Sequence, residues 1–171
     1  MKFIDQLKEK AKQNKKTIVL PETLDMRTIE AAGKVLAEGI ANIILVGDKE
    51  DIMSRAGDID LSGASFVDPK NYEKFDEYVD AFVEMRRKKG MTEARAKELL
   101  LTNPLYFGCM MVKQDDADGM VAGAINASAD VLRAALQTLK TAPGTRIVSA
   151  FFLVVVPDCQ YGANGTFVFA D

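Results

Sequence analysis

Short apolar runs alternate along the chain with longer stretches in which apolar residues recur every three or four positions. The runs at 17–20, 42–46, 64–67 and 120–124 are nearly continuous in Val, Ile, Leu and Ala, as is typical of buried strands. The stretches between them have the periodicity of helices. Strands separated by helices predict a parallel sheet covered on both faces, which is an α/β/α sandwich.

Capping residues and glycines indicate where the predicted helices begin and end. Asp25 or Thr28 begins one helix, Gly39 ends it, and Pro104 occupies the first turn of another. The predicted helices cover 2–14, the stretch from this cap to Gly39, 48–56, 72–89, a stretch after Thr92, one opened by Asn103-Pro104, and 129–140. The apolar face of the last helix consists of Val131, Leu132, Ala135, Leu136 and Leu139.

The end of the chain has a different pattern. Residues 147–156 predict a long buried strand with Phe151, Phe152, Val154 and Val156 in the core, residues 162–165 a turn, and residues 166–170 another strand. A buried parallel strand needs a crossover and a covering element. We therefore expect the front part of a longer protein, with a first α/β domain at 1–143 and the opening strands of a second domain at 144–171.

The amino-acid composition and net charge exclude several classes of catalytic site and binding partner. The 171 residues are 48% hydrophobic, carry a net charge of −3 and include no histidine. The hydrophobic fraction predicts a globular core, and the net negative charge gives no reason to expect binding to nucleic acid or to an anionic membrane. Without histidine, Ser-His-Asp catalysis and imidazole-ligated metal sites are excluded within this chain, and no metal site is expected.

The spacing of the cysteines and the length of the apolar runs indicate the cellular compartment. Cys109 and Cys159 lie far apart with no CxxC spacing, and the N-terminus lacks the apolar core of a signal peptide. The longest apolar run, 150–156, is far shorter than the roughly 20 residues that span a bilayer. We expect a cytoplasmic protein.

The stretch 118–133 carries the most specific chemical signal. It runs from a buried strand through glycines into a helix start. Gly123 allows a ligand close to the backbone, Asn126 and Ser128 can cap the helix, and Arg133 adds a positive charge one turn into it. Free amides at a helix N-terminus favour phosphate or carboxylate, so this pattern predicts an anion site.

An ordinary structural explanation of the same residues stays open, because Asp130 and Arg133 are spaced i,i+3 and can form a surface ion pair. Ligands of open α/β sheets bind outside the carboxyl ends of the strands. That rule places the loops of interest at 21–25, 47–48, 123–128 and 157–159. The standard glycine-rich fingerprints of dinucleotide and nucleoside-triphosphate sites are absent from the sequence.

Five motifs together resemble the phosphate acetyltransferase (phosphotransacetylase) family. They occupy, in this order, 21–27, 39–47, 118–133, 149–159 and 165–171. The resemblance spans essentially the whole chain, whereas family members are about twice as long, so it covers their N-terminal half. It implies a two-domain α/β fold like that of isocitrate and isopropylmalate dehydrogenases, a homodimer, and an active site in the interdomain cleft.

The activity that the resemblance implies is reversible acetyl transfer between acetyl-CoA and inorganic phosphate, which gives acetyl phosphate and CoA. Coenzyme A is then a substrate, and no cofactor is tightly bound. In the family, an aspartate deprotonates the CoA thiol and the thiolate attacks the acetyl carbonyl in a ternary complex, assisted by serine and arginine. These three positions lie beyond Asp171, so the catalytic residues are unknown here and the chain alone is expected to be inactive.

The resemblance also assigns substrate-binding residues. Arg133 would contact a phosphate, and Ser128, Asn126 and the backbone at Gly123 would line the same pocket. Arg87 matches an arginine near CoA, although a cation at the end of a helix also complements the helix dipole without any ligand.

Cys159 falls close to the cleft, where a thiol after an apolar strand is more often a packed bystander. Asp158 either orients its neighbours or caps a turn.

Three other functions remain open from the sequence alone. The first is a phosphate butyryltransferase, which the size of the acyl pocket would distinguish. The second is a non-catalytic phosphotransacetylase-like module that senses CoA or phosphate. The third is a dehydrogenase of the isocitrate type, which would need a metal-binding cluster of aspartates that the sequence does not display.

Overall fold

The computed structural model describes residues 3–170 in two compact units. One unit is Ala11–Lys140, and the other is the described part of Met1–Lys10 with Thr141–Asp171. Lys2, where the first predicted helix begins, and Asp171, where the predicted second domain stops, lie outside the described residues. None of the helices in 3–170 is both long enough and apolar enough to span a bilayer.

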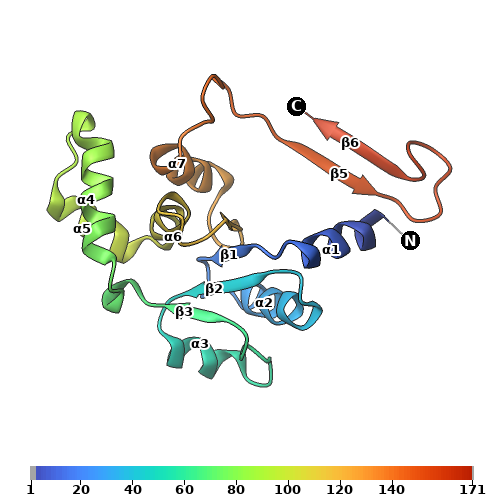
Figure 1. Cartoon of the computed structure of the whole chain (residues 1–171), viewed down its shortest axis with the longest axis horizontal. Helices are drawn as coiled ribbons and strands as arrows, with labels where there is room; N and C mark the ends of the chain where they lie inside the picture. The colour runs from blue at the N-terminus through green and yellow to red at the C-terminus, as the bar shows by residue number, and fades with distance from the viewer. Residues whose placement is uncertain (1–2, 171) are drawn as a thin grey trace. The chain divides into compact units, whose positions relative to one another are not determined.

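A four-stranded parallel sheet lies at the centre of the larger unit (Figure 1). Its strands are β1 (Thr17–Leu20), β2 (Asn42–Val46), β3 (Ser65–Val67) and β4 (Gly119–Met120), in the order β3-β2-β1-β4. The pairing sets Thr17 opposite Asn42 and Ile18 opposite Gly119. The chain first adds strands on one side of β1 and then places β4 on its other side. The switch point of the topology therefore lies between β1 and β4.

The helices of this unit agree with the predicted pattern. They are α2 (Met26–Glu38), α3 (Lys49–Ala56), α4 (Phe75–Arg86), α5 (Glu93–Thr102), α6 (Pro104–Lys113) and α7 (Ser128–Thr138), with 3-10 turns η1 (Pro69–Asn71) and η2 (Arg87–Lys89). Asp25 caps α2 by accepting from the Arg27 amide, and Gly39 ends α2 in a left-handed conformation. The helix predicted at 72–89 is shorter, because α4 starts at Phe75 and its end tightens into η2. The first predicted helix, α1 (Phe3–Gln13), belongs to both units.

Two apolar cores cover the two faces of the sheet, because successive strand residues point to opposite faces. Leu20, Ile43 and Leu45 pack with α2 and α3, whereas Val19, Ile44 and Val46 pack with residues of α4 to α7. Helices α2 and α3 therefore lie on one face and α6 on the other (Figure 1). The predicted parallel-sheet sandwich is confirmed, whereas its dehydrogenase-like two-domain classification stays a prediction.

A polar network fixes the turn that leads into β4. Asp116 accepts hydrogen bonds from Lys74, from Tyr78 and, at 3.2 Å, from Tyr72. Burial raises the pKa of Asp116, but the hydrogen bonds from Lys74 and Tyr78 lower it more, so it stays below its usual range. The Tyr72 and Tyr78 rings meet edge to face with centroids 5.3 Å apart. This network joins the start of α4 to the end of the α6–β4 connection.

The face that α7 buries differs from the predicted one. Ala134 and Thr138 are fully buried, whereas Leu132 is 47% and Leu136 44% exposed. Val131 and Ala135 are partly buried against the core. The helix packs on α6 through its small residues, which allow close approach, so the buried stripe is rotated away from the two leucines.

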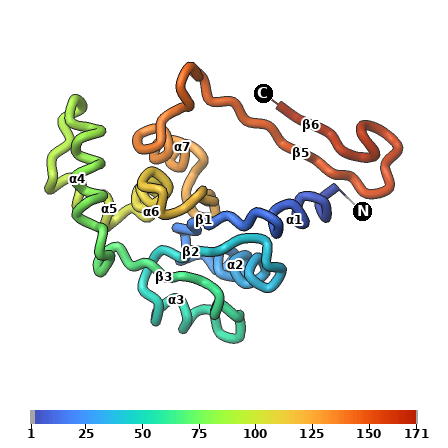
Figure 2. The backbone as a smooth tube through the Cα atoms, in the orientation of Figure 1, coloured from blue at the N-terminus to red at the C-terminus, as the bar shows by residue number. Residues whose placement is uncertain are grey.

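The C-terminal segment forms a hairpin of β5 (Phe151–Val155) and β6 (Thr166–Ala170), seen as two adjacent runs at the red end of the tube in Figure 2. The strands are antiparallel, and the segment 156–165 that connects them includes the predicted turn at 162–165. The prediction that Phe151, Phe152, Val154 and Val156 are core residues is wrong for the described residues, because these side chains are 39–73% exposed. A two-stranded hairpin pairs its backbone groups but has no second layer of its own.

Candidate functional site

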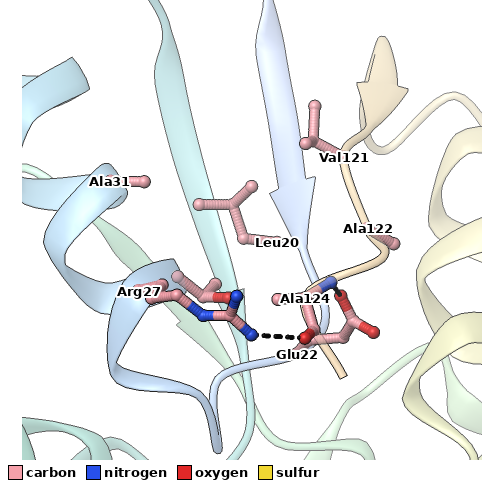
Figure 3. A pocket seen from close by; sticks show the side chains of 8 residues that line it. Leu20, Glu22, Arg27, Ala31, Val121, Ala122 and Ala124 are labelled. Carbon is pink, nitrogen blue, oxygen red and sulfur yellow. Dashed lines mark hydrogen bonds between the residues drawn. The ribbon is translucent and has the colours of Figure 1, made fainter. Parts of the chain in front are cut away.

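Two loops meet at the switch point of the sheet, one after β1 and one after β4. Between them lies a cavity of about 200 Å³ (Figure 3). Its lining residues are Leu20, Glu22, Arg27, Thr28, Ala31, Val121, Ala122 and Ala124. These are the loops at 21–25 and 123–128 that the sequence pattern points to, and the position is the one that ligands of open α/β sheets occupy.

Glu22 holds the loop after β4. Its Oε2 accepts the amides of Gly123 and Ala124, both at 2.6 Å. Its Oε1 accepts the amides of Ile125 at 3.1 Å and Asn126 at 2.8 Å, together with the Asn126 side-chain amide at 2.8 Å. The amides that we expected to be open to a ligand therefore bind a carboxylate of the chain itself.

Glu22 is only 3% exposed, so its ionisation matters for the site. Burial raises the pKa of its carboxyl group, but the hydrogen bonds from Asn126, Ala124 and Ile125 lower it more, and the pKa falls from its ordinary 4.5 to about 2. The carboxylate is consequently ionised at neutral pH. The positive ends of the amide dipoles compensate its charge.

The predicted caps of α7 are wrong in detail. The N-cap residue is Ala127, which has no side-chain cap, and its carbonyl accepts from the amides of Asp130 and Val131. Ser128 is the first residue of the helix, and the Asn126 side chain is bound to Glu22. β4 also ends earlier than the predicted 120–124, at Met120, and the chain turns toward Glu22 from Gly123, which has a φ of +109°.

Arg27 holds the same loop from the other side. Its Nη2 donates to the carbonyl of Ala124 at 2.6 Å (Figure 3). The same Nη2 also donates to Asp25 at 2.7 Å. Hydrogen bonds and charge from Arg27 lower the pKa of Asp25. Glu22 and Arg27 were not among the predicted site residues, although both lie in the motif at 21–27. The signal that marks Glu22 is a charged residue directly after a buried strand, at the carboxyl edge of the sheet.

Arg133 forms the ion pair that its spacing allows. Its Nη1 lies 2.5 Å from Oδ1 of Asp130, and its side chain is 57% exposed. The pair uses only part of the guanidinium, which has five donors. The predicted roles of Arg133 in binding phosphate and of Ser128 in lining the same pocket stay predictions.

Helix α4 ends in two arginines with different surroundings. Arg87 is exposed and lies 3.4 Å from Glu84. Arg86, which the sequence did not single out, has a buried Nε without a hydrogen-bond partner among the described residues. Both Arg86 and Arg133 act electrostatically on the Tyr106 hydroxyl: burial raises the pKa of Tyr106, and the two guanidinium groups oppose that rise. The ends of α4 and the start of α7 thus bring two cations near one phenol on α6.

Cys159 and Asp158 lie in the connection between β5 and β6, within the smaller unit. Asp158 has a left-handed φ of +56°, as in a turn, and Cys159 is a partly buried free thiol. Their predicted nearness to the site stays a prediction. Within residues 3–170, no group of three or more His, Cys, Asp or Glu side chains is arranged to hold a metal ion.

Comparison with known proteins gives a consistent result. The family described as "Phosphate acetyl/butaryl transferase" matches residues 2–171. The chain is 54% identical over 171 residues to a phosphate acetyltransferase of Acetivibrio thermocellus, covering all of this chain and 51% of that protein. It is 53% identical to the phosphate acetyltransferase of Thermoanaerobacterium thermosaccharolyticum, again covering all of this chain and 52% of the relative.

Solved structures show the same relationship. A phosphotransacetylase from Streptococcus pyogenes is 34% identical and superposes with a TM-score of 0.85, covering 98% of this chain and 51% of that one. The EutD phosphotransacetylase from Staphylococcus aureus is 35% identical, with a TM-score of 0.83 over 96% of this chain and 48% of its own. The chain spans about half the length of the curated relatives it matches.

Proposed function

Because this chain belongs to the phosphate acetyl/butaryl transferase family, we propose that a polypeptide of the relatives' length that contains it, here the full-length protein, transfers acetyl groups between acetyl-CoA and inorganic phosphate. The observation that carries this proposal is the unbroken match of the chain, at 54% identity, to a phosphate acetyltransferase. Acetyl is favoured over butyryl because several relatives are named for acetyl transfer. Coenzyme A and phosphate are then substrates, and no cofactor is tightly bound.

The proposed reaction is a direct displacement. A base takes the thiol proton of CoA, and the sulfur attacks the carbonyl carbon of acetyl phosphate. The new C–S bond forms while the C–O bond to phosphate breaks, and phosphate leaves with the electron pair. We propose that the base and its serine and arginine partners belong to the part of the full-length protein outside residues 1–171. The 171-residue chain is then inactive by itself.

The proposed contribution of this chain is to bind phosphate. Arg86 on α4 and Arg133 on α7 both oppose the rise in the pKa of Tyr106 on α6, while Asp130, the partner of Arg133, adds to that rise. The buried Nε of Arg86, which has no hydrogen-bond partner within residues 3–170, supports a ligand role, because a buried donor without an acceptor is costly and a phosphate oxygen would satisfy it. Guanidinium groups also bind phosphate through paired, charge-assisted hydrogen bonds. Free amides at the N-terminus of a helix such as α7 also favour phosphate.

The remaining proposals concern organisation. Residues 1–143 form most of a first domain and 144–171 open a second one, with the active site in the cleft that the two domains make in the full-length protein. That protein is a cytoplasmic homodimer. Arg87, Ser128, Asn126 and the backbone at Gly123 stay candidates for contact with substrate, although Asn126 and Gly123 would contact it while their amides bind Glu22.

The test is the formation of acetyl-CoA from acetyl phosphate and CoA by the full-length protein and its variants. Losing one charge-assisted phosphate contact costs on the order of 2–4 kcal/mol, so Arg133→Ala should lose roughly 30- to 1000-fold in kcat/KM. Arg133→Lys should recover only part of this loss, because an ammonium group does not bind phosphate in a bidentate way. Arg95→Ala removes an exposed arginine from α5 and serves as the matched control.

Arg86→Ala and Arg87→Ala distinguish the two arginines at the end of α4. We expect the larger loss from Arg86→Ala. A larger loss from Arg87→Ala would assign the role to Arg87, as the sequence resemblance first implied. Unchanged kinetics in both Arg133 variants would remove Arg133 from the site.

A further inference from the structure

We propose that Glu22 is a positioning residue: its carboxylate fastens the loop after β4 to the loop after β1 and so fixes where α7 begins and where Arg133 is presented. This inference rests on the proposed function for its catalytic consequence. Its structural part, the fastening of one loop by the other, is tested independently below.

The contacts of Glu22 saturate its carboxylate. Two oxygens accept five N–H groups, four from consecutive backbone amides and one from the Asn126 side chain. A carboxylate offers about four lone-pair positions, so no capacity remains for a further ligand. Glu22 is also almost fully buried. The group is therefore part of the scaffold of the site and not a free acid or base.

Among the described residues, the backbone amides of Gly123–Asn126 donate only to this carboxylate. β4 ends at Met120, and the amide of Val121 makes the last bond to β1, at 3.0 Å from the carbonyl of Val19. The next element begins at Ser128. In between, the left-handed φ of Gly123 lets successive amides point the same way and form a concave anion-binding backbone. Glu22 fills that concavity.

Arg27 completes the arrangement with opposite polarity. It donates to the carbonyl of Ala124, while Glu22 accepts from the amide of the same residue. The amide side of this segment is therefore bound by Glu22 in the loop after β1, and its Ala124 carbonyl is bound by Arg27 in the first turn of α2. Only Ala127 lies between the fastened Asn126 and the first residue of α7. A shift of the loop would thus move the start of the helix and, with it, the arginine on its second turn.

This assignment distinguishes two anion-binding features of the stretch 118–133: the amides of Gly123–Asn126, and the start of α7 with the guanidinium group of Arg133. The amides of Gly123–Asn126 are occupied by a permanent internal carboxylate, so a substrate phosphate does not displace it there. The substrate meets the amides of α7 and the guanidinium groups. Catalysis depends on Glu22 through geometry, since misplacing a binding group by about 1 Å costs on the order of 100-fold in rate.

The experiment compares Glu22→Gln and Glu22→Ala with Glu30→Gln in the full-length protein. Glu30 is an exposed glutamate on α2 and controls for loss of a charge. Gln keeps the size of the side chain but turns an N–H group toward the amides, so kcat/KM for acetyl phosphate should fall roughly 10- to 100-fold. Glu30→Gln should stay within about twofold of the native protein.

Rescue by formate identifies the role of the carboxylate. Glu22→Ala leaves a space beside four free amides, so added formate should restore part of its activity. Glu22→Gln, whose side chain still fills that space, should not respond. A folded Glu22→Ala variant without rescue, or native activity in both variants, would overturn the proposal.

Hydrogen exchange tests the positioning apart from the reaction. The amides of Gly123–Asn126 should exchange faster in both Glu22 variants than in the native and Glu30→Gln proteins. Unchanged protection of these four amides would overturn the proposal, whatever the activity. An inactive native protein with the expected exchange pattern would instead refute the proposed function and leave the positioning role standing.

Discussion

The buried carboxylate of Glu22 makes a prediction about stability that depends on pH. The pKa of Glu22 is about 2 in the folded chain and 4.5 without the fold. A tenfold difference in proton affinity is worth about 1.4 kcal/mol, so ionised Glu22 stabilises the folded chain by at most about 3–4 kcal/mol at pH 7. Because the folded pKa is the lower one, this stability is complete above the unfolded value and is lost as the pH falls toward 2.

Glu22→Gln removes the titrating group and therefore the pH dependence that belongs to it. The native chain should exceed the variant by about 2–3 kcal/mol in the free energy of unfolding at pH 7, and by roughly half of that at pH 3. Urea unfolding of both proteins at the two pH values measures the difference. The other carboxylates titrate equally in both proteins and cancel. The same difference at pH 7 and pH 3 would refute the assigned charge state and its hydrogen bonds.

Two further substitutions test the scaffold around the site, with the free energy of unfolding of each variant measured at pH 7. Asp116→Asn removes the charged acceptor shared by Lys74, Tyr72 and Tyr78, and should cost about 2–3 kcal/mol because these donors lose their acceptor. Destabilisation below about 0.5 kcal/mol would show that the network is not a structural tie. Gly123→Ala adds a Cβ that meets no atom within 4 Å but has a φ of +109°, so it should cost about 1–2 kcal/mol through backbone strain alone. A neutral result would show that the loop can relax.

The repeating elements of the larger unit are predictable from sequence because local patterns decide them. The strands at 17–20 and 42–46 have the predicted bounds, and Asp25 and Gly39 begin and end α2 as expected. The resemblance to phosphate acetyltransferases is also confirmed, since the family matches residues 2–171 and the chain is 54% identical over 171 residues to a phosphate acetyltransferase. Capping residues, glycines and apolar runs determine structure within a few residues of themselves, so their effects can be predicted from one sequence.

Contacts between distant residues set the features that the sequence did not predict. Glu22 accepts hydrogen bonds from residues about a hundred positions further along the chain. No local sequence pattern predicts that a glutamate will bind the free amides of that turn. The same carboxylate binds the Asn126 side chain, which therefore does not cap α7. Asp116 and its tyrosines are likewise joined only by the fold.

Apolar character alone does not predict which side chains of α7 and β5 are buried. Leu132 and Leu136 are about half exposed, because the smaller Ala134 and Thr138 allow α7 to approach α6 closely. The phenylalanines of β5 are exposed although their strand is as apolar as any in the sheet. An apolar run predicts a strand well, but the layer that covers it is a property of the whole assembly of elements.

The most direct measurement of the central claim is acetyl-CoA formation by the purified full-length protein supplied with acetyl phosphate and CoA. The account predicts steady formation of acetyl-CoA that requires both substrates, releases one phosphate for each acetyl group transferred, and falls by at least about 30-fold in Arg133→Ala. A folded full-length protein that makes no acetyl-CoA from these substrates would contradict it.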